Sequence, residues 1–360
     1  MQQSKNNISL LLILTAIVTL IIMSISCNDN PVAPGNEPPP GRRDYEWSVD
    51  TLISPMWLAE KMWGSSPQNV WVIGGGGGAM ERIWHYDGTS WKNPGGVERV
   101  GPPHAIYGLG ENKMWVGGVD GQITFYDGNS WTESYRYTPE NSSFTSIEDI
   151  YGHNENDVYA VGLYAVDDGS NQTRGFILHY DGVEWKEVYK ADYHSYFYRI
   201  FPYGINTYYI EEIRLEIFPD EPEYIGITKF DGEKVTSIYM KSVPEIGSWA
   251  EVLKVGEEIY FVTKKQIYQL SDDRLIPFLK IDNPNFYYGV IGSNKNNIFL
   301  SMSDGIAHYN GNNIEYLMYY PEGEVRLTGG VVFLDEVFFV GISNATYLTH
   351  IYHGKTIETK

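Results

Sequence analysis

The side chains in this chain that are best suited to chemistry are its carboxylates. The sequence holds 46 Asp and Glu residues against 26 Lys and Arg residues, and its formal net charge at pH 7 is −20. A glycosidase uses two carboxylates at a defined separation, so the composition would suit an enzyme that acts on carbohydrate, such as a hydrolase or lyase. No spacing in the sequence selects one pair of acids, and an enzyme therefore stays an alternative interpretation.

Histidines are the next candidates, because imidazole is a common metal ligand. His85, His179 and His308 each lie three residues before a turn position that recurs along the chain. Equivalent positions of separate repeats are held apart, so these three side chains cannot meet on one metal ion. Other histidines, such as His104, show no ligand spacing. We therefore expect no metal and no cofactor.

Two loops have part of the chemistry of known ligand sites. Gly74–Gly78 is a run of five glycines, but a phosphate-binding loop also needs a lysine at fixed spacing and a following helix. Asp167–Asn171 offers several oxygen ligands of the kind that Ca²⁺ prefers, but it is too short and lacks the late bidentate Glu. The sequence therefore predicts a hairpin loop in the first case and a solvated turn in the second.

The elements that must position any site are repeats. In the first copy the apolar run Val70–Gly74 is followed by Trp84–Gly88 and then by Trp91. The turn position recurs at residues 88, 128, 182, 232, 272, 311 and 354, at intervals of 40, 54, 50, 40, 39 and 43 residues. A unit of about 40–50 residues with several short strands is typical of a propeller blade. We therefore predict an all-β protein, a seven-bladed β-propeller of four-stranded antiparallel blades, over residues 45–360.

Asp-Gly and Asn-Gly turns are expected to join the third and fourth strands of the blades. Such dipeptides favour a type I′ turn, which needs positive φ at both central residues. Turns with poorer matches are expected at Ser271-Asp272 and His353-Gly354. The turn residues expected to have a structural role are Asp87, Gly88, Asp127, Gly128, Asp181, Gly182, Asp231, Gly232, Asn310 and Gly311.

How the ring closes is left open by the sequence. The last unit is expected to have its own fourth strand around Thr356–Lys360. The segment Glu46–Leu52 also alternates like a strand. It could pair with the last blade, either as an extra edge strand or in place of a weak one.

The N-terminus has the pattern of an export signal. Lys5 precedes a nearly continuous apolar run, Ile8–Ile25, and Ser24–Cys27 resembles the cleavage box of bacterial lipoproteins, except that Ser24 stands where that family usually has Leu. The resemblance implies a signal peptide over residues 1–26 and a lipid, such as palmitate, on Cys27, the single cysteine of the chain. An uncleaved membrane helix and ordinary secretion with cleavage nearby are the alternatives.

Residues 27–44 are expected to form the lipid-attachment cysteine and a proline-rich tether. Cleavage before Cys27 would leave a formal charge of −21, which repels nucleic acid and anionic headgroups. We therefore expect a protein of the bacterial cell envelope, periplasmic or on the outer-membrane surface. It would reach the membrane through its anchor, and nucleic acid would not be a partner.

The repeat unit Met62–Gly74, closing with His85–Trp91, resembles a repeat of exported bacterial β-propellers and lipoproteins of unassigned role. The resemblance implies the fold and the compartment and transfers no functional residues. The turn is also distantly similar to the Asp-box hairpin of sialidases, but His85 stands where that box has Ser or Thr. Tyr198–Pro202 has part of the sialidase arginine motif, but Phe201 interrupts it and the motif lies in the fourth repeat.

Loop length distinguishes one face of the predicted ring. The connection between the second and third strands is long in the third and fourth repeats, and it opens on the same face as the links between blades. Insertions in repeat proteins tend to mark the binding face, although these loops could instead have no function. The candidate ligand-binding residues on this face are Tyr164, Asp167, Asp168, Tyr189, Tyr193, Tyr196, Asp220, Glu221 and Tyr288.

Tyrosines with acids nearby suit a sugar or a peptide. The sequence thus favours a lipid-anchored propeller that binds a protein or polysaccharide through the face with the insertions. A carbohydrate-active hydrolase or lyase is the first alternative, and a structural or assembly factor of the envelope is the second.

Overall fold

The structure is a computed structural model that describes residues 38–52, 58–75, 82–94, 96, 100–170, 172–204, 206–215 and 222–357. The side chains of residues 58–60 and 288 are not described. The chain divides into two compact units, Met1–Pro39 and Pro40–Lys360. The second unit is described below. Cys27 and the apolar run before it lie outside the described residues.

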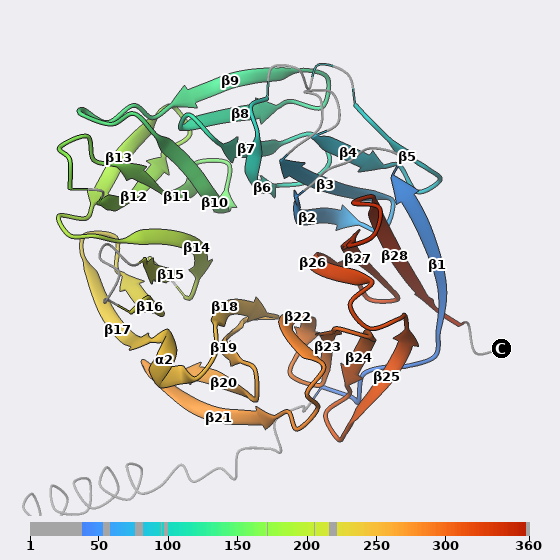
Figure 1. Cartoon of the computed structure of the whole chain (residues 1–360). Coiled ribbons are helices and arrows are strands. Elements are labelled where there is room, and N and C mark those ends of the chain that lie inside the picture. Colours follow the sequence, from blue (N-terminus) through green and yellow to red (C-terminus); the bar gives the residue numbers. More distant parts are fainter. Residues whose placement is uncertain are drawn as a thin grey trace, which may run out of the picture. The chain divides into compact units, whose positions relative to one another are not determined.

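Seven four-stranded antiparallel sheets stand around a central axis (Figure 1), so the predicted seven-bladed β-propeller is confirmed. Blade 1 contains β2 (Leu58–Ser66), β3 (Asn69–Gly75), β4 (Ile83–Tyr86) and β5 (Trp91–Lys92). Blade 2 contains β6 (Pro103–Gly108), β7 (Met114–Gly118), β8 (Gln122–Tyr126) and β9 (Trp131–Arg136). Blade 3 contains β10 (Thr145–Asn154), β11 (Asp157–Ala165), β12 (Thr173–Tyr180) and β13 (Trp185–Lys190).

The remaining blades follow in chain order. Blade 4 contains β14 (Tyr196–Pro202), β15 (Tyr208–Arg214), β16 (Tyr224–Phe230) and β17 (Val235–Ser242), and the short helix α2 (Val243–Ile246) follows it. Blade 5 contains β18 (Ala250–Val255), β19 (Glu258–Thr263), β20 (Gln266–Ser271) and β21 (Arg274–Lys280). Blade 6 contains β22 (Phe286–Asn294), β23 (Asn297–Met302), β24 (Gly305–Tyr309) and β25 (Ile314–Tyr319). Blade 7 contains β26 (Val325–Val332), β27 (Glu336–Ser343), β28 (Thr349–Thr356) and β1 (Tyr45–Leu52).

The N-terminal strand closes the ring. β1 is the outermost strand of blade 7 and pairs with β28 over its whole length, from Tyr45 opposite Thr356 to Leu52 opposite Thr349. The predicted turn at His353-Gly354 is wrong, because both residues lie within β28. Thr356, where a fourth strand was expected to begin, is the last residue of β28. The blade takes its fourth strand from the start of the domain, which is one of the arrangements that the sequence left open.

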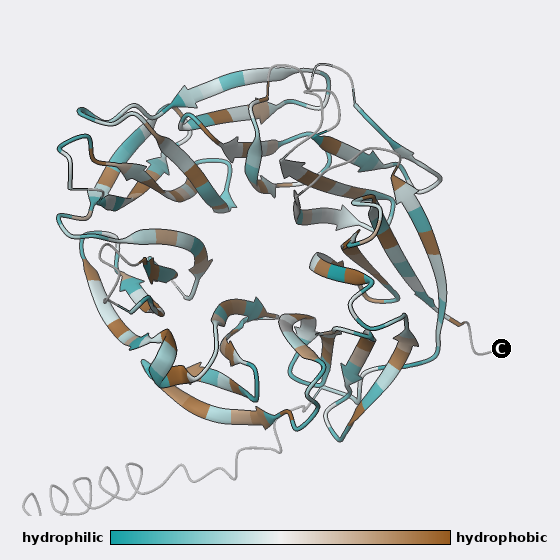
Figure 2. Ribbon diagram, in the orientation of Figure 1, coloured by the Kyte–Doolittle hydropathy of each residue, from teal (hydrophilic) through white to brown (hydrophobic). Residues whose placement is uncertain are grey.

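The hydrophobic core is divided among the interfaces between neighbouring blades. Seven clusters of buried side chains each combine residues of two adjacent blades. The second strands are the most deeply buried, and every residue of β3 and of β27 is buried. The outer strands β17, β21 and β1 instead mix hydrophobic and hydrophilic residues (Figure 2) and include exposed positions, as strands with one face in solvent do. Each blade is thus stabilised by its neighbours.

The Asp-Gly and Asn-Gly turns between third and fourth strands have a different conformation from the predicted one. Gly88 has φ of +86°, but Asp87 is not among the described residues with positive φ. Tyr86 pairs with Trp91, so the loop has four residues and is not a two-residue type I′ turn. The Asp87 carboxylate accepts the backbone N–H groups of Thr89 and Ser90, each at 3.0 Å. The equivalent pattern recurs at Asp127, Asp181, Asp231 and Asn310.

The repeated histidine has a structural role in several blades. His85 stacks on Trp71 with ring centroids 4.1 Å apart and lies 2.8 Å from the Asn69 side chain. The same arrangement joins His179 to Tyr159 and Asp157, and His308 to Phe299 and Asn297. His353 of blade 7 repeats it with Phe338 and Glu336. The position fixes the second and third strands together.

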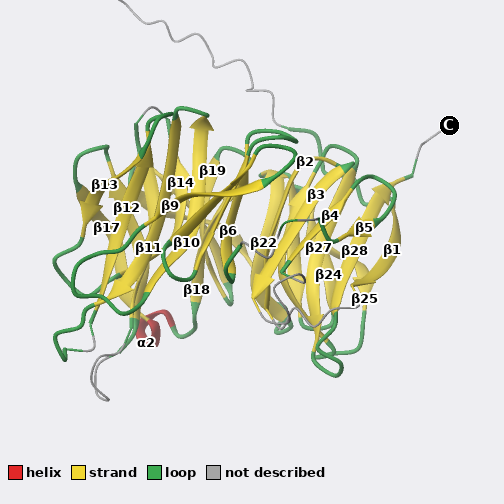
Figure 3. Ribbon diagram, turned by 90° about the horizontal axis from the view of Figure 1, so that it is seen from above, coloured by secondary structure: helices red, strands yellow, loops and turns green. Residues whose placement is uncertain are grey.

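The two faces of the ring carry different connections. Links between blades and connections between second and third strands lie on one face, called here the insertion face. It includes α2 (Figure 3). The turns between first and second strands and between third and fourth strands lie on the opposite face. Among the described residues, no helix is long and apolar enough to cross a membrane.

The residues just before β1 lie against blade 6. The backbone N–H of Gly41 donates to the carbonyl of Asn296 at 2.8 Å, in the turn between β22 and β23. Arg43 forms an ion pair with Glu315 at 2.8 Å and donates to the carbonyl of His308. The part of the predicted tether from Gly41 to Asp44 is therefore bound to the ring at the opposite face.

Candidate functional site

The candidate residues that the sequence placed on the insertion face do not form one site. Tyr164 is buried, with 8% of its surface exposed. Tyr189 stacks against Phe197, and the Tyr193 ring lies 4.8 Å from the guanidinium of Arg214. These three tyrosines are therefore held by packing between neighbouring blades.

The acidic candidates that the structure describes are turn residues. Asp167 accepts a hydrogen bond from the Ser143 hydroxyl at 2.7 Å. Asp168 accepts the backbone N–H of Ser170 at 2.8 Å, so it caps an exposed turn. Asp220, Glu221 and the side chain of Tyr288 lie outside the described part of the chain.

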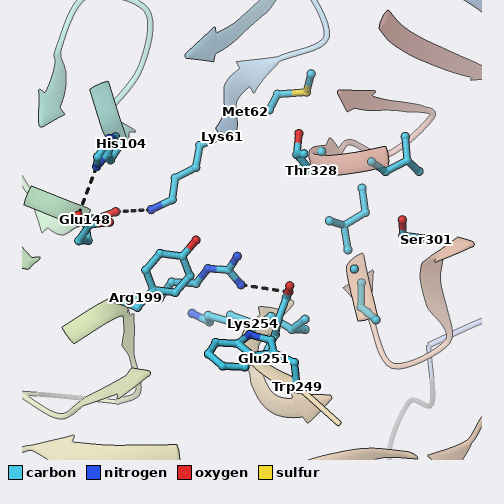
Figure 4. Close-up of a pocket in the computed structure, with 18 of the residues that line it drawn as sticks. Lys61, Met62, His104, Glu148, Arg199, Trp249, Glu251, Lys254, Ser301 and Thr328 are labelled. Carbon is cyan, nitrogen blue, oxygen red and sulfur yellow. Dashed lines mark hydrogen bonds and ion pairs between the residues drawn. The ribbon is translucent and has the colours of Figure 1, made fainter. Parts of the chain in front are cut away.

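Among the residues of the predicted set that the structure describes, Tyr196 alone lines a cavity. The cavity has a volume of about 990 Å³ and is enclosed mainly by the first strands of the blades around the central axis. That volume is at the upper end of the roughly 300–1,000 Å³ typical of small-molecule sites. Figure 4 shows the side chains that converge on it.

β-Bulges direct side chains into this cavity. In blades 1, 2, 3, 4 and 7 the pairing of the first and second strands skips one residue. A second skip in blades 1 and 3, at Ser65 and His153, lies away from the cavity, but the described side chains that are skipped in the first half of the first strand all line it. They are His104, Glu148, Tyr198 and Thr328. A bulge re-aims a side chain and is common next to functional sites.

In three of those blades the residue after the bulge is charged. Blade 5 has no bulge but also carries a charged residue at this level. These charged residues are Lys61 in blade 1, Asp149 in blade 3, Arg199 in blade 4 and Glu251 in blade 5. Blades 2 and 7 carry Ala105 and Gly329 at this level. The charges therefore alternate in sign over one side of the channel.

These charges pair between blades. The Lys61 ammonium lies 2.8 Å from the Asp149 carboxylate and donates to the carbonyl of Glu148 at 2.6 Å. Arg199 lies 3.4 Å from the Glu251 carboxylate, and Asp149 also accepts the backbone N–H of Ile200 at 3.0 Å. The pairs join blade 1 to blade 3, blade 3 to blade 4, and blade 4 to blade 5.

Glu148 is the centre of a second group of contacts. One carboxylate oxygen lies 3.2 Å from His104 Nδ1, and the other accepts the Tyr196 hydroxyl at 2.8 Å. Burial opposes ionisation of Glu148, but the contacts with His104, Ser146 and Tyr196 outweigh it and hold the pKa of the carboxyl below its usual range. The group is therefore a carboxylate at neutral pH.

Glu211 lies behind Arg199 in the second strand of blade 4. Its partner in the ladder is Arg199, and its carboxylate lies 3.8 Å from the Arg199 Nε. Only 1% of its surface is exposed. Burial raises the pKa of Glu211 to about 8; Arg199 lowers it and Glu251 raises it further. At neutral pH this side chain is thus mainly a neutral carboxylic acid.

Apolar side chains surround the insertion-face end of the cavity. Phe144 precedes β10, Leu215 follows β15, Trp249 precedes β18, and Tyr287 is near the start of β22. Phe144, Leu215 and Tyr287 are 42%, 38% and 49% exposed. We call these four residues the apolar rim. A ligand that entered from this face would meet apolar surface first and charged groups deeper in the channel.

The sequence did not single out the charged residues of the first strands. Arg199 was considered only as part of a motif that did not match. The signal that could have found them is the repeat itself. Aligned on the second strands, Lys61, Asp149 and Arg199 each lie 12 residues before the equivalent residues Ile73, Val161 and Glu211, and Glu211 stands where the second strand otherwise carries an uncharged residue. No group of three or more His, Cys, Asp and Glu side chains that could hold a metal ion occurs within the ranges that the structure covers.

Fold and cavity together define a seven-bladed propeller with a ligand-sized central cavity, and known structures share this architecture. Scans against protein-family models and curated proteins found no match. The structure of YCF48 bound to D1 peptide has a TM-score of 0.56 at 11% identity, covering 89% of this chain and 99% of that one. The Cps50 (Swd1) β-propeller domain of Myceliophteria thermophila has a TM-score of 0.55 at 8% identity, covering 86% and 100%.

A third solved structure comes from a longer protein. The extracellular domain of BT4673 from B. thetaiotaomicron has a TM-score of 0.53 at 12% identity, covering 87% of this chain and 43% of that one. At such identities these likenesses show the fold alone.

Proposed function

We propose that this protein is a binding module of a bacterial cell envelope, held to the membrane by a lipid on Cys27, and that it captures a segment of another protein in its central cavity. The observation that carries the proposal is the mixed lining of the cavity, with the apolar rim at the insertion face and charged pairs deeper in the channel. A peptide presents both kinds of group. The similar propeller YCF48 was solved with a peptide bound.

One cation at the cavity offers a contact for an acidic group of the partner. Arg326 lies in β26, lines the cavity and is exposed. Within the described ranges, no ion pair between Arg326 and a carboxylate is found, whereas Lys61 and Arg199 have acidic partners. Since guanidinium binds carboxylate in a two-pronged geometry, an acidic side chain or a chain terminus of the partner suits this position.

The course of the N-terminal segment supports the choice of face. Gly41 is bound to the turn between β22 and β23, on the face opposite the rim. A tether that leads from Gly41 back to a lipid at Cys27 would therefore start from that opposite face. The apolar rim lies on the other face of the ring, away from Gly41.

An enzyme has less support from this geometry. A glycosidase needs a carboxylic acid and a carboxylate on either side of the bond that is cleaved. Glu148 and Glu251 line the cavity, but each is engaged by a neighbouring basic side chain. Glu211, whose pKa is raised, is buried behind Arg199 and is not among the lining residues.

The test is capture from envelope extract by the full-length protein, with two matched substitutions. Leu215→Asp places a charge in the apolar rim, whereas Val183→Asp places one on the opposite face, where Val183 is 86% exposed. We expect Leu215→Asp to lose a captured protein that the wild type and Val183→Asp both retain. Capture of glycans alone, or equal capture by all three proteins, would contradict the proposal.

A further inference from the structure

A second cavity lies at the perimeter of the ring, between blade 7 and blade 1. Its volume is about 550 Å³, which is also within the range of ligand sites. Side chains of β1, β4, β5, β28 and the turn before β5 line it. The lining residues are Ser48, Asp50, Thr51, Leu52, Trp84, Tyr86, Thr89, Ser90, Trp91 and His353. We call this cavity the perimeter groove.

The groove exists because two outer strands differ from the rest. The fourth strand of blade 1, β5, has two residues, whereas the fourth strands of the other blades have six to eight. The neighbouring outer strand is β1, which arrives from the N-terminus. It exposes Ser48 and Asp50 next to blade 1. The interface that closes the ring thus lacks the full cover of an ordinary fourth strand.

Trp91 shows the effect of this missing cover. It is equivalent to Trp131 of blade 2 and Trp185 of blade 3, because each follows its turn glycine by three residues. Trp131 and Trp185 are 1% and 5% exposed, and the Trp185 indole donates to Ser134 of the preceding blade. Trp91 is only half-buried and lines the groove. The aromatic surface that is buried in Trp131 and Trp185 is therefore accessible in Trp91.

The lining has the chemistry that recognises a sugar. Trp84, Tyr86 and Trp91 supply aromatic surface on which the C–H face of a pyranose can pack, and the Tyr86 and Trp91 rings are 5.3 Å apart. The carboxylate of Asp50 and the hydroxyls of Ser48 and Ser90 can accept and donate hydrogen bonds to sugar hydroxyls. Flat aromatic faces beside hydrogen-bonding groups suit a ring that is itself apolar on its faces and polar at its edge.

The charge of the groove disfavours an anionic ligand. Asp50 is exposed, and the lining residues that the structure describes include no Lys or Arg. The formal net charge of the chain is also −20. A phosphate, a sulfate or a uronic acid would therefore meet only repulsion at this place.

We propose that the perimeter groove is a binding site for a neutral saccharide, separate from the central cavity and additional to the proposed capture of a protein. The site is formed by ring closure, since Asp50 comes from the N-terminal strand and Trp91 from blade 1. In a cell envelope such a site would hold the propeller on a neutral glycan while the insertion face remains open.

The experiment is saturation-transfer difference NMR on the full-length protein in detergent, with cellotriose, maltotriose, chitotriose, mannotriose and xylotriose as probes. We expect at least one of these to bind. Asp50→Ala, which changes an exposed side chain, should weaken that binding about tenfold, equivalent to about 1.4 kcal/mol. Trp91→Ala should abolish it. Glu46→Ala is the matched control, because Glu46 is exposed on the same strand and lies outside the groove.

Several results would overturn the assignment. Binding of none of the five saccharides at millimolar concentration would do so, as would equal binding by the wild type and Asp50→Ala. If Trp91→Ala fails to fold, the comparison of Asp50→Ala with Glu46→Ala decides alone. Loss of saccharide binding in Leu215→Asp would place the sugar in the central cavity instead. Because that variant tests the rim separately, failure of this site leaves the proposed protein capture standing.

Discussion

The Lys61 ammonium of blade 1 lies 2.8 Å from the Asp149 carboxylate of blade 3 and thus bypasses blade 2. Blade 2 carries Ala105 at the same level of the channel, so a small side chain leaves room for the contact. The side chains of Lys61 and Asp149 are 19% and 16% exposed. A contact between blades that are not neighbours fixes the width of the channel on its charged side.

Removal of the Lys61 charge should therefore destabilise the ring. We expect Lys61→Met to lower the free energy of unfolding by about 1–3 kcal/mol, because it leaves a mostly buried carboxylate without its cation. Urea unfolding measures the difference. The control is Lys186→Met, which removes an exposed ion pair with Asp181 and should change the stability much less. Equal losses of stability in the two variants would show that the contact between Lys61 and Asp149 does not stabilise the ring.

The turn glycines allow conformational strain to be separated from steric clash. Gly182 and Gly232 have φ of +91° and +94°. A Cβ on Gly182 would lie 2.2 Å from the Asn156 side-chain oxygen, whereas one on Gly232 would meet nothing within 4 Å. Gly232→Ala should cost about 1 kcal/mol from backbone strain alone, and Gly182→Ala should cost more. Thermal unfolding of both variants checks the order. The reverse order would contradict this account of the turns.

Glu211 should make stability depend on pH. Its folded pKa is raised to about 8, above its ordinary value of 4.5. The folded state therefore holds one more proton between these values, so the stabilisation is complete at low pH and is lost as pH rises toward 8. Glu211→Gln removes this dependence, and at pH 9 it should be more stable than the wild type by about 1–3 kcal/mol.

The measurement is urea unfolding of the wild type and Glu211→Gln at pH 5 and pH 9. Glu257→Gln serves as the control, because the Glu257 side chain is 92% exposed. The difference in stability between this variant and the wild type should be the same at pH 5 and at pH 9. A wild type that is as stable as Glu211→Gln at pH 9 would indicate that Glu211 ionises normally.

Lipidation at Cys27 stays a prediction from the sequence. Labelling cells with a fatty-acid analogue should mark the wild type and leave Cys27→Ser unmarked. The apolar run before the sole cysteine is the reason for this expectation. Equal labelling of both proteins would mean that another residue carries the lipid or that none does.

The repeat predicted the fold because strand alternation and turn residues are local patterns. It did not predict how the ring closes, since the pairing of Tyr45 with Thr356 joins residues far apart in the chain. His353 illustrates the error: it was assigned to a turn but lies in β28, where it occupies the position of His85 and His308. The contacts of this histidine are thus retained in blade 7, although the turn that follows it in the other blades is not present there.

The candidate site was harder to predict for a related reason. Tyr196 was found because tyrosines on exposed loops stand out, but its partner Glu148 is directed into the channel by a bulge. A bulge depends on the register of two strands, and no sequence pattern in one strand alone specifies it. Lys61 and Asp149 meet only because the ring curves, which a linear sequence does not show.

Site-specific photocrosslinking tests the central claim most directly. A benzophenone amino acid would replace Phe144 or Leu215 in the apolar rim and, as controls, Val183 or Leu334 on the opposite face. The last two are 86% and 90% exposed. Irradiation in intact cells should give the same protein adduct from both rim positions and from neither control. Adducts from Val183 or Leu334 with none from Phe144 or Leu215 would contradict binding through the central cavity.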